Sequence, residues 1–311
     1  MRRRALVTGG AGFLGHHLIK LLLKEGWAIA AIDNFFAGKR EHIEPFTSDA
    51  NFILYEGDIT DLHFVKRVLR AANPEIVFHL AAIHFIPFCM AHCGETLKVN
   101  VVGTQTILDA IEEFPIKKLV FASTGDVYLN SDNPHQENDP VSPRNIYGIS
   151  KLFGEQLISL VRIKNPSSEF ITARLFNIYG PGETNPHLFP DILACLRKAR
   201  ILRLGNMEPK RDYIFVGEVA KALHLLALYE GRETTFNVGT GTGTNVWDIV
   251  KNLENLLGSP LQVETDPLKL RKVDRPNLVA NVSRLKQELG WAPSVPLERG
   301  LEITLRYESI I

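Results

Sequence analysis

The sequence predicts an α/β protein in which a doubly wound parallel sheet is joined to a smaller C-terminal α/β lobe. Two observations lead to this fold class. Short apolar runs, typical of buried strands, alternate with stretches of helical spacing as far as about residue 175. A glycine-rich turn also joins the first apolar run to the first helical stretch. Strands that alternate with helices predict a parallel sheet covered on both faces.

The N-terminal segment shows this pattern most clearly. Arg4–Thr8 is an apolar run stopped by two glycines, which suits a buried strand. Phe13–Glu25 has apolar residues at helical spacing, and Ala28–Asp33 follows as the second strand. Further strands are expected at Phe52–Tyr55, Ile76–Ala81, Leu119–Ala122 and Phe170–Leu175, with helices at about 63–72, 96–113 and 146–163.

The last third of the chain lacks this regular alternation, and Pro181, Pro186 and Pro190 interrupt it. We expect residues 1–180 to form the sheet domain and residues 181–311 the smaller lobe, with a soft boundary that the chain crosses more than once. The lobe should pack at the carboxyl edge of the sheet, where open α/β sheets bind ligands. Its expected elements are helices near 187–199, 216–229, 245–257 and 283–290, with short strands such as Thr235–Val238.

The composition is that of a globular protein with a sizeable core. Of the 311 residues, 45% are hydrophobic, and 35 Lys and Arg balance 35 Asp and Glu. A chain without net charge is not typical of nucleic-acid binding, and no apolar run approaches the ~18 residues that span a bilayer. Too few apolar residues follow the basic N-terminus for an export signal. Three cysteines suit a reducing compartment, so we expect a cytoplasmic protein without nucleic-acid or membrane partners.

The turn after the first strand predicts a dinucleotide site. Gly9, Gly12 and Gly15 form a GxxGxxG pattern between strand and helix. The first glycine allows a tight turn, the second lets the backbone approach a pyrophosphate, and the third permits close helix–sheet packing. Asp33 ends the second strand 18 residues after Gly15. A carboxylate there accepts hydrogen bonds from ribose hydroxyls and repels a 2′-phosphate, so we expect NAD rather than NADP.

The GxxGxxG spacing resembles that of the extended short-chain dehydrogenase/reductase family. Further motifs of its NAD-dependent nucleotide-sugar epimerases and dehydratases follow in order, so that the likeness runs from residue 5 to about 300. These motifs are Gly57-Asp58-Ile59, His79-Leu80-Ala81-Ala82, Asn100, Tyr147-Gly-Ile-Ser-Lys151, the stretch from Arg174 to Pro181, Arg211-Asp-Tyr213 and Phe236-Asn-Val-Gly239. The chain looks like the UDP-glucose 4-epimerase-like members and also carries features of GDP-4-keto-6-deoxymannose reductases.

The resemblance implies a Rossmann-type fold that binds NAD along the carboxyl ends of the strands. The residues expected to bind NAD are Gly9, Gly12, Phe13, Leu14, Gly15, Asp33, Asn34, Asp58, Ile59, Leu80, Ala81, Ala82, Asn100, Tyr147, Lys151 and Phe176.

Three side chains are expected to carry the chemistry. Tyr147 and Lys151 are four residues apart in a helical pattern and should share one face. A nearby ammonium favours the phenolate form of a tyrosine, and the lysine can also hold the nicotinamide ribose. The resemblance places Thr124 at the family's catalytic Ser/Thr, which hydrogen-bonds the reacting sugar oxygen. It implies that Tyr147 takes the proton of a sugar hydroxyl while hydride passes to NAD.

Asp126 bears on the choice between related activities and is a further catalytic candidate. Dehydratases of the family usually have Glu there as the base for elimination, whereas this chain has the shorter Asp126 after Gly125. The lack of an acid at 125 favours a nucleotide-sugar 4-epimerase, which oxidises C4 reversibly to a 4-keto intermediate. The stretches 123–128 and 266–276 resemble GDP-4-keto-6-deoxymannose reductases. A GDP-4-keto-6-deoxy-sugar reductase or a sugar-nucleotide 4,6-dehydratase is therefore the alternative.

A nucleotide-sugar substrate carries a diphosphate, for which guanidinium groups are suitable partners. The resemblance places Arg211 at a position that contacts this diphosphate, and either Arg271 or Arg275 supplies a second arginine. Asn177 should hydrogen-bond the substrate near the diphosphate. His84 follows the HLAAI segment directly and is expected to touch substrate or nicotinamide.

Three other features complete the expectations. The cysteines and histidine of Cys89-Met-Ala-His-Cys93 are not expected to bind metal, because a structural zinc normally needs four ligands from paired short spacings. Asn185-Pro-His187 opens the small lobe and is a candidate for the pocket wall. Relatives commonly dimerise through helices that correspond to about 100–113 and 147–163, so the resemblance implies a homodimer.

Overall fold

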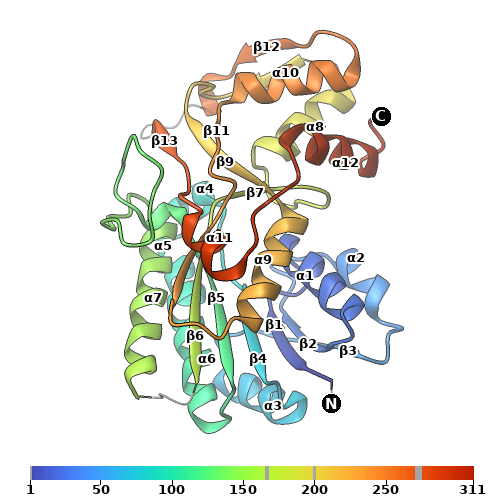
Figure 1. Ribbon diagram of the computed structural model, residues 1–311. Coiled ribbons are helices and arrows are strands. Elements are labelled where there is room, and N and C mark those ends of the chain that lie inside the picture. The colour runs from blue at the N-terminus through green and yellow to red at the C-terminus, as the bar shows by residue number, and fades with distance from the viewer. Residues whose placement is uncertain (1, 165–167, 199–200, 270–274) are drawn as a thin grey trace.

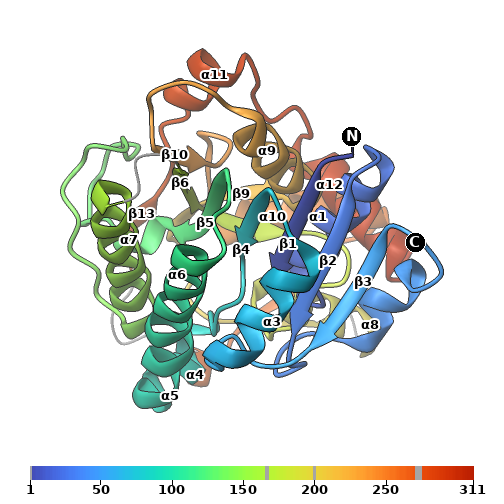
Figure 2. The ribbon, with the colours of Figure 1, turned by 90° about the horizontal axis from the view of Figure 1, so that it is seen from below.

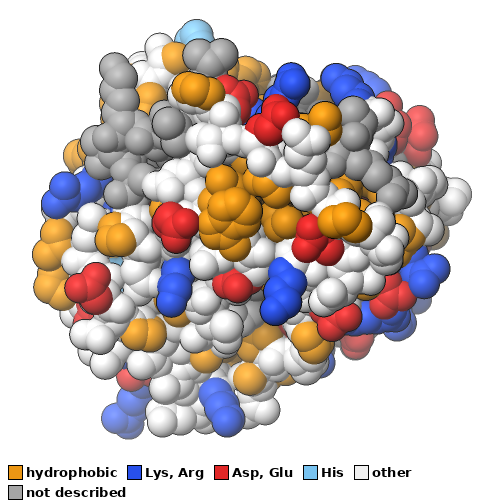
Figure 3. Space-filling view, turned by 90° about the horizontal axis from the view of Figure 1, so that it is seen from above, with side chains coloured by type: hydrophobic (Ala, Val, Ile, Leu, Met, Phe, Trp, Pro, Cys, Tyr) orange, Lys and Arg blue, Asp and Glu red, His pale blue; other side chains and the backbone are white. Residues whose placement is uncertain are grey.

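The computed structural model describes residues 2–164, 168–198, 201–269 and 275–311 (Figure 1). A large sheet with helices on both faces forms one part of the molecule, and a smaller lobe lies beyond one end of its strands (Figure 1). On the face of the molecule seen from above, Lys and Arg side chains lie among Asp and Glu side chains (Figure 3). This mixed surface agrees with the zero net charge of the chain.

The large sheet has seven strands, all paired in parallel. They are β1 (Arg4–Thr8), β2 (Ala28–Asp33), β3 (Phe52–Glu56), β4 (Ile76–His79), β5 (Lys118–Thr124), β6 (Glu169–Leu175) and β10 (Thr235–Val238). Their order is β10-β6-β5-β4-β1-β2-β3, so the direction of winding reverses between β1 and β4. Open α/β sheets bind ligands outside the carboxyl ends of the strands at such a switch point.

Helices cover both faces of this sheet, which confirms the predicted doubly wound fold (Figure 2). α1 (Phe13–Lys24) and α9 (Val216–Leu228) bury their apolar sides in the core of one face. α3 (Leu62–Ala72), α6 (Gly103–Glu113) and α7 (Ile146–Lys164) share the core of the other. Within the described ranges, a search for a helix long and apolar enough to cross a bilayer finds none.

The segment before α6 differs from the single helix expected at 96–113. It consists of α4 (Ile86–Ala91), α5 (Cys93–Leu97) and the π-helical turn Lys98–Val102, which runs on into α6. A π turn widens the helix locally and is frequent at functional sites. The side chain of its central residue, Asn100, is hydrogen-bonded to Ile83 and Ser150.

The smaller lobe has a core of its own. α8 (Leu188–Lys198), α10 (Val246–Leu257) and α12 (Leu297–Tyr307) enclose buried leucine, isoleucine and valine side chains. The last residue of the helix expected at 187–199 lies outside the described residues. Short strands complete the lobe: β8 (Ile201–Leu204) with β12 (Gln262–Thr265), and β7 (Asn177–Tyr179), β9 (Lys210–Phe215), β11 (Gly243–Thr244) and β13 (Asn277–Leu278).

The chain returns from this lobe to the large sheet. α9 packs against α1, β10 pairs with β6 as an edge strand, and α11 (Ser283–Leu289) packs on β10. Residues 216–238 therefore belong with the sheet, although they lie within the region 181–311 that we expected to form the lobe. The crossover from β6 to β10 passes through the lobe strands β7 and β9. For that reason α9 does not directly follow a strand of the large sheet in the sequence.

Candidate active site

A cavity of about 1220 Å³ lies at the carboxyl ends of the large sheet's strands. Loops after β1, β2, β4 and β5 and the start of α7 form one side of it. The segment 183–189 and the lobe strand β9 contribute to the other side. The cavity is thus shared between sheet and lobe, at the switch point of the strand order.

The glycine-rich turn at the cavity requires glycine for both conformation and space. Gly9 has a φ of 72°, and a Cβ there would lie 2.9 Å from the backbone nitrogen of Ala81. A Cβ at Gly15 would lie 2.1 Å from the carbonyl oxygen of Gly9. A side chain at either position would clash with the backbone, so these glycines allow the turn to pack tightly against the loop after β4 and the start of α1. Free amides at a helix start bind phosphate, so the turn fits the pyrophosphate of NAD.

Asp33 ends β2 and lines the cavity beside this turn. Its Oδ2 accepts a hydrogen bond from the backbone amide of Ala11 at 2.9 Å, and its Oδ1 accepts one from the amide of Phe35 at 2.7 Å. Burial raises the pKa of Asp33, while these backbone hydrogen bonds lower it. The carboxylate is therefore held beside the turn, as hydrogen bonding to ribose hydroxyls requires.

A second fixed carboxylate, Asp58, follows β3. Asn34 Nδ2 donates to Asp58 Oδ2 at 3.0 Å, and the amide of Thr60 donates to Oδ1 at 2.8 Å. Burial opposes ionisation, but the hydrogen bonds from Thr60 and Asn34 outweigh it and lower the pKa of Asp58.

β4 ends at His79, two residues before the end of the expected strand Ile76–Ala81. The residues that follow, Leu80, Ala81 and Ala82, are thereby free to line the cavity.

All but one of the residues expected to bind NAD line this cavity. Those that do are Gly9, Gly12, Phe13, Leu14, Gly15, Asp33, Asn34, Asp58, Ile59, Leu80, Ala81, Ala82, Tyr147, Lys151 and Phe176.

The exception is Asn100, which is 2% exposed in the π turn and does not line the cavity. Its Oδ1 accepts from the amide of Ile83 at 2.8 Å, and its Nδ2 donates to the Ile83 carbonyl oxygen at 2.8 Å and to Ser150 Oγ at 2.9 Å. Ser150 Oγ in turn donates to the carbonyl oxygen of Tyr147 at 2.7 Å. Asn100 therefore joins the loop after β4 to the start of α7, while its contact with NAD stays a prediction.

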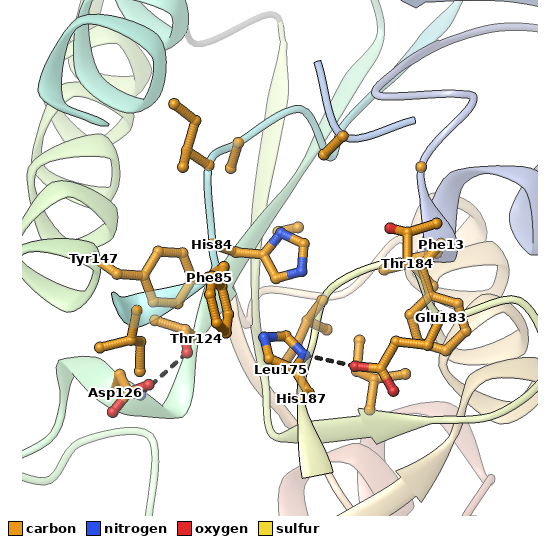
Figure 4. A pocket seen from close by; sticks show the side chains of 18 of the residues that line it. Phe13, His84, Phe85, Thr124, Asp126, Tyr147, Leu175, Glu183, Thr184 and His187 are labelled. Carbon is orange, nitrogen blue, oxygen red and sulfur yellow. Dashed lines mark hydrogen bonds and ion pairs between the residues drawn. The ribbon is translucent and has the colours of Figure 1, made fainter. Parts of the chain in front are cut away.

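Thr124, Tyr147 and Lys151 meet on the sheet side of the cavity. Thr124 is the last residue of β5, and the other two lie one turn apart at the start of α7. The side chain of Thr124 lies below the ring of Tyr147, and its hydroxyl oxygen accepts a hydrogen bond from the backbone amide of Asp126 at 3.2 Å (Figure 4). The structure thus brings the three expected catalytic side chains together.

Burial controls the ionisation of this group. It raises the pKa of Tyr147 well above its ordinary range, and the carboxylate of Asp126 adds to the rise. Burial also lowers the pKa of Lys151 to about 7, against the opposing effect of Glu155. That Lys151 favours a Tyr147 phenolate stays a prediction; in this structure the loss of solvation disfavours the charged form of Tyr147. Tyr147 is a protonated hydroxyl that can donate a hydrogen bond.

Asp126 is held to one side of the cavity by its neighbours. Its Oδ1 lies 3.9 Å from Arg275 Nε and accepts from Asn145 Nδ2 at 3.4 Å, and Arg275 Nη2 donates to its carbonyl oxygen at 2.9 Å. At the preceding position, a Cβ on Gly125 would lie 3.1 Å from the ring of Phe176. The Phe176 ring would therefore have to shift by a few tenths of an ångström to admit a Cβ at 125.

The expected substrate-binding residues in the described part of the chain also line the cavity. Arg211 comes from β9, and its Nη1 donates to the carbonyl oxygen of Arg275 at 2.8 Å. Asn177 begins β7, and His84 follows β4. Arg271, the alternative to Arg275 as the second arginine, lies outside the described residues.

The cysteines near the cavity point to separate backbone carbonyls. Cys89 Sγ donates to the carbonyl oxygen of Ile83, and Cys93 Sγ donates to that of Met90, each at 3.5 Å. Among the described residues, no group of three or more His, Cys, Asp or Glu side chains is arranged to hold a metal ion.

Glu183 and Thr184, which were not predicted from the sequence, line the cavity from the lobe side. The prolines on either side indicated only an interruption of the alternation. One sequence feature could have pointed to Glu183: its carboxylate lies between a Gly-Pro-Gly turn and the Asn185-Pro-His187 segment. Polar loops at sheet edges commonly carry functional residues.

Known proteins share this fold and this order of motifs. The chain matches the model of the GDP-mannose 4,6 dehydratase family over residues 6–304. A UDP-glucose 4-epimerase of Corynebacterium glutamicum is 34% identical over 93% of this chain and 91% of its own. A dTDP-D-glucose 4,6-dehydratase of Mus musculus is 29% identical over 98% of this chain and 88% of its own.

A solved structure extends the likeness to three dimensions. The crystal structure of UDP-glucose 4-epimerase from Bifidobacterium longum in complex with NAD+ and UDP has a TM-score of 0.90 at 27% identity, covering 98% of both chains. The family match spans nearly the whole chain, from β1 to α12. The chain therefore belongs to the GDP-mannose 4,6-dehydratase family, among the NAD-dependent nucleotide-sugar enzymes of the extended short-chain dehydrogenase/reductases.

Proposed function

We propose that this protein is a nucleotide-sugar 4-epimerase that acts on a UDP-hexose with NAD as its cofactor. The observation that carries the proposal is that Gly125 supplies no acidic side chain beside Asp126, next to an intact group of Thr124, Tyr147 and Lys151. The site can therefore oxidise a carbinol but lacks the acid and base arrangement that elimination of water needs. UDP-glucose 4-epimerases among the relatives support the choice of sugar nucleotide.

Residues of the cavity wall fit NAD. The amides at the start of α1 would hold its pyrophosphate, Asp33 would accept hydrogen bonds from its adenosine ribose, and Tyr147 and Lys151 would hold its nicotinamide end. When bound, NAD would supply the reversible hydride chemistry at C4.

Side chains of the protein transfer the proton of the C4 hydroxyl. Thr124 and Tyr147 hydrogen-bond the sugar oxygen, and Tyr147 Oη accepts its proton as the carbon–oxygen bond becomes a carbonyl. Because Tyr147 starts protonated, its own proton has to move on. Lys151 has a pKa of about 7, so its Nζ can take up a proton near neutral pH and give it back when C4 is reduced.

The diphosphate is assigned to the two arginines of the cavity wall. Arg211 Nη1 donates to the backbone carbonyl oxygen of Arg275, and the Arg275 guanidinium contacts Asp126, so both arginines line the cavity. Asn177 is the proposed partner near the diphosphate, and Arg271 remains a candidate from the same stretch.

Coenzyme balance separates this function from its alternative. A GDP-4-keto-6-deoxy-sugar reductase consumes NADH or NADPH with every turnover, whereas an epimerase returns the hydride and consumes none. The protein is incubated without added coenzyme with UDP-, GDP-, CDP- and dTDP-sugars, and the products are identified by NMR. Interconversion of 4-epimers of a UDP-hexose is the expected result. Turnover only with added reduced coenzyme, or formation of a 6-deoxy-4-keto sugar, would refute the epimerase.

We also propose a homodimer in a reducing compartment. Phe153, Leu160 and Ile163 on α7 are 54%, 59% and 78% exposed, and Val102 of the neighbouring π turn is 51% exposed. Apolar side chains at these spacings form a stripe along one face of the helix, which a second copy of the chain would cover. The cysteines Cys89, Cys93 and Cys195 are free thiols, which supports the cytoplasm as the location.

A further inference from the structure

The lobe side of the cavity carries a polar cluster that the hydride chemistry does not use. Glu183 and His187 come from the segment between β7 and α8, and His84 comes from the loop after β4. All three point into the cavity that Tyr147 faces from the other side (Figure 4). The cluster therefore lies beside the place where a bound sugar would be.

The centre of the cluster is a buried Glu–His pair. Glu183 Oε1 and His187 Nδ1 are 2.5 Å apart, and the side chain of Glu183 is only 4% exposed. The second carboxylate oxygen, Oε2, is buried and has no hydrogen-bond partner among the described residues. Burial raises the pKa of Glu183, and His187 partly offsets this rise. A buried polar atom left without a partner costs stability, which is expected where the group serves a ligand.

The pair defines which nitrogen of His187 is available. An ionised carboxylate can only accept hydrogen bonds, so Nδ1 of His187 carries the hydrogen that is donated to Glu183. In the neutral ring Nε2 then carries a lone pair, and it is turned away from Glu183 (Figure 4). The imidazole packs against the rings of His84 and Phe85, with centroid separations of 5.5 and 5.4 Å. Its side chain is 32% exposed, so its open edge reaches the cavity.

His84, unlike His187, does not present an open acceptor nitrogen to the cavity. Its Nε2 lies 3.1 Å from Nδ2 of Asn185, an atom that can only donate, so the acceptor nitrogen of His84 is already occupied. Burial lowers the pKa of His84 to about 3, which keeps the ring neutral. His84 therefore braces the ring of His187, and within this cluster the open nitrogen belongs to His187.

We infer that His187 is a sugar-binding residue whose Nε2 accepts a hydrogen bond from a hydroxyl of the substrate's hexose, and that Glu183 is the positioning residue that maintains this form of the ring. The inference rests on the proposed function and adds a requirement to it. The hexose must present a donating hydroxyl to the lobe side of the cavity while its C4 faces Tyr147. Thr124 and Tyr147 then hold the sugar from the sheet, and His187 holds it from the lobe.

The test combines variants of His187 with sugars that lack one hydroxyl. NAD-loaded protein is assayed with UDP-glucose and with its 2-deoxy, 3-deoxy and 6-deoxy analogues, both by kcat/KM and by calorimetric dissociation constants. His187→Phe keeps a ring against His84 and Phe85 but removes the nitrogens, and His187→Leu is measured as a second variant. His63→Phe, at an exposed position of α3 outside the cavity, makes the same chemical change as a control.

The expected result is a coupling between one side chain and one hydroxyl. For wild type and His63→Phe, kcat/KM should be about tenfold lower with one deoxy analogue than with UDP-glucose, as expected for the loss of one hydrogen bond. For His187→Phe, kcat/KM with UDP-glucose should be about tenfold below that of wild type. It should not fall further when that analogue replaces UDP-glucose. Glu183→Gln keeps an acceptor for Nδ1 and should stay within about threefold of wild type, whereas Glu183→Leu should match His187→Phe.

The outcomes separate this inference from the proposed function. Conversion of UDP-glucose without added coenzyme tests the function alone. If wild type and both His187 variants lose the same factor on every analogue, the inference is overturned while the function stands. If UDP-glucose binds but is not converted, the dissociation constants still decide on His187. A folded, NAD-loaded protein that binds none of these nucleotide sugars overturns both.

Discussion

The hydroxyl oxygen of Tyr147 lies near Thr124 and, in the proposed reaction, contacts the substrate. Replacing Tyr147 by Phe removes this atom alone and so tests its role. Tyr147→Phe should lower kcat by about a thousandfold, because proton transfer to the sugar oxygen is lost. NAD should remain bound, since the turn at Gly9 and the carboxylate of Asp33 are untouched. Product formation is followed by NMR and bound NAD by its absorbance after denaturation. Turnover close to that of wild type would contradict the role given to the phenol.

The proposed function assigns the choice between NAD and NADP to the charge of Asp33. Asp33→Ala removes the acceptor for the ribose hydroxyls and the repulsion of a 2′-phosphate. We expect the dissociation constant for NAD to rise by about tenfold or more and the preference for NAD over NADP to shrink by a similar factor. Calorimetric titration of cofactor-free protein with each dinucleotide measures both. An unchanged preference would mean that the ribose is recognised by other residues.

Lys151 gives the stability of the protein a pH dependence. Its pKa in the folded chain, about 7, lies below the value of 10.5 expected in the unfolded chain. Between these two values the unfolded chain binds more protons, so the free energy of unfolding rises with pH across this window. Relative to Lys151→Met, cofactor-free wild type should therefore gain stability from pH 7 to pH 9. Urea unfolding at both values measures it, and a parallel pH course for the two proteins would contradict the shift.

At the scale of elements, the π turn depends on one side chain. Asn100→Ala leaves the amide and carbonyl of Ile83 and the hydroxyl of Ser150 without their partner. We expect a loss of about 1–3 kcal/mol in the free energy of unfolding, as for buried polar groups left unsatisfied. Turnover should also fall, because the start of α7 is no longer fixed. Asn252→Ala in α10 removes an amide that bonds its own helix and should cost less by urea unfolding.

Elements were predictable from sequence where local pattern decides them. β1, α1 and β2 agree with expectation because an apolar run, a glycine turn and helical spacing follow one another directly. The π turn was not predicted, because the hydrogen bonds between its central residue Asn100 and Ile83 join different segments of the chain. The NAD-binding role of Asn100 stays a prediction.

For the whole molecule, the apolar stripe on α7 predicts association. Leu160→Glu places a charge in the proposed interface and should raise the dissociation constant of the dimer by at least about tenfold. Light scattering after gel filtration should show twice 34.9 kDa for wild type and a shift toward 34.9 kDa for the variant. Leu228→Glu on α9, which is 37% exposed on the other side of the sheet, is the matched control. A wild-type mass of 34.9 kDa at all concentrations would contradict the dimer.

The sheet side of the site was more predictable than the lobe side. Asp33 and Thr124 stand at strand ends, and Tyr147 stands at a helix start, so their places follow from the alternation of elements. The pair of Glu183 and His187 meets His84 only because the lobe folds back over the sheet. Such contacts depend on the tertiary fold, and no spacing in the sequence encodes them.

The route of the chain also limits how this enzyme can be recombined with its relatives. A chimera joined at residue 180 would take β10 from one parent and β6, its partner in the sheet, from the other. It would likewise press α9 of one parent against α1 of the other. To exchange sugar specificity between relatives, two separate stretches should therefore be replaced, one before α9 and one after β10. The segment from α9 to β10 should be kept with its own parent sheet.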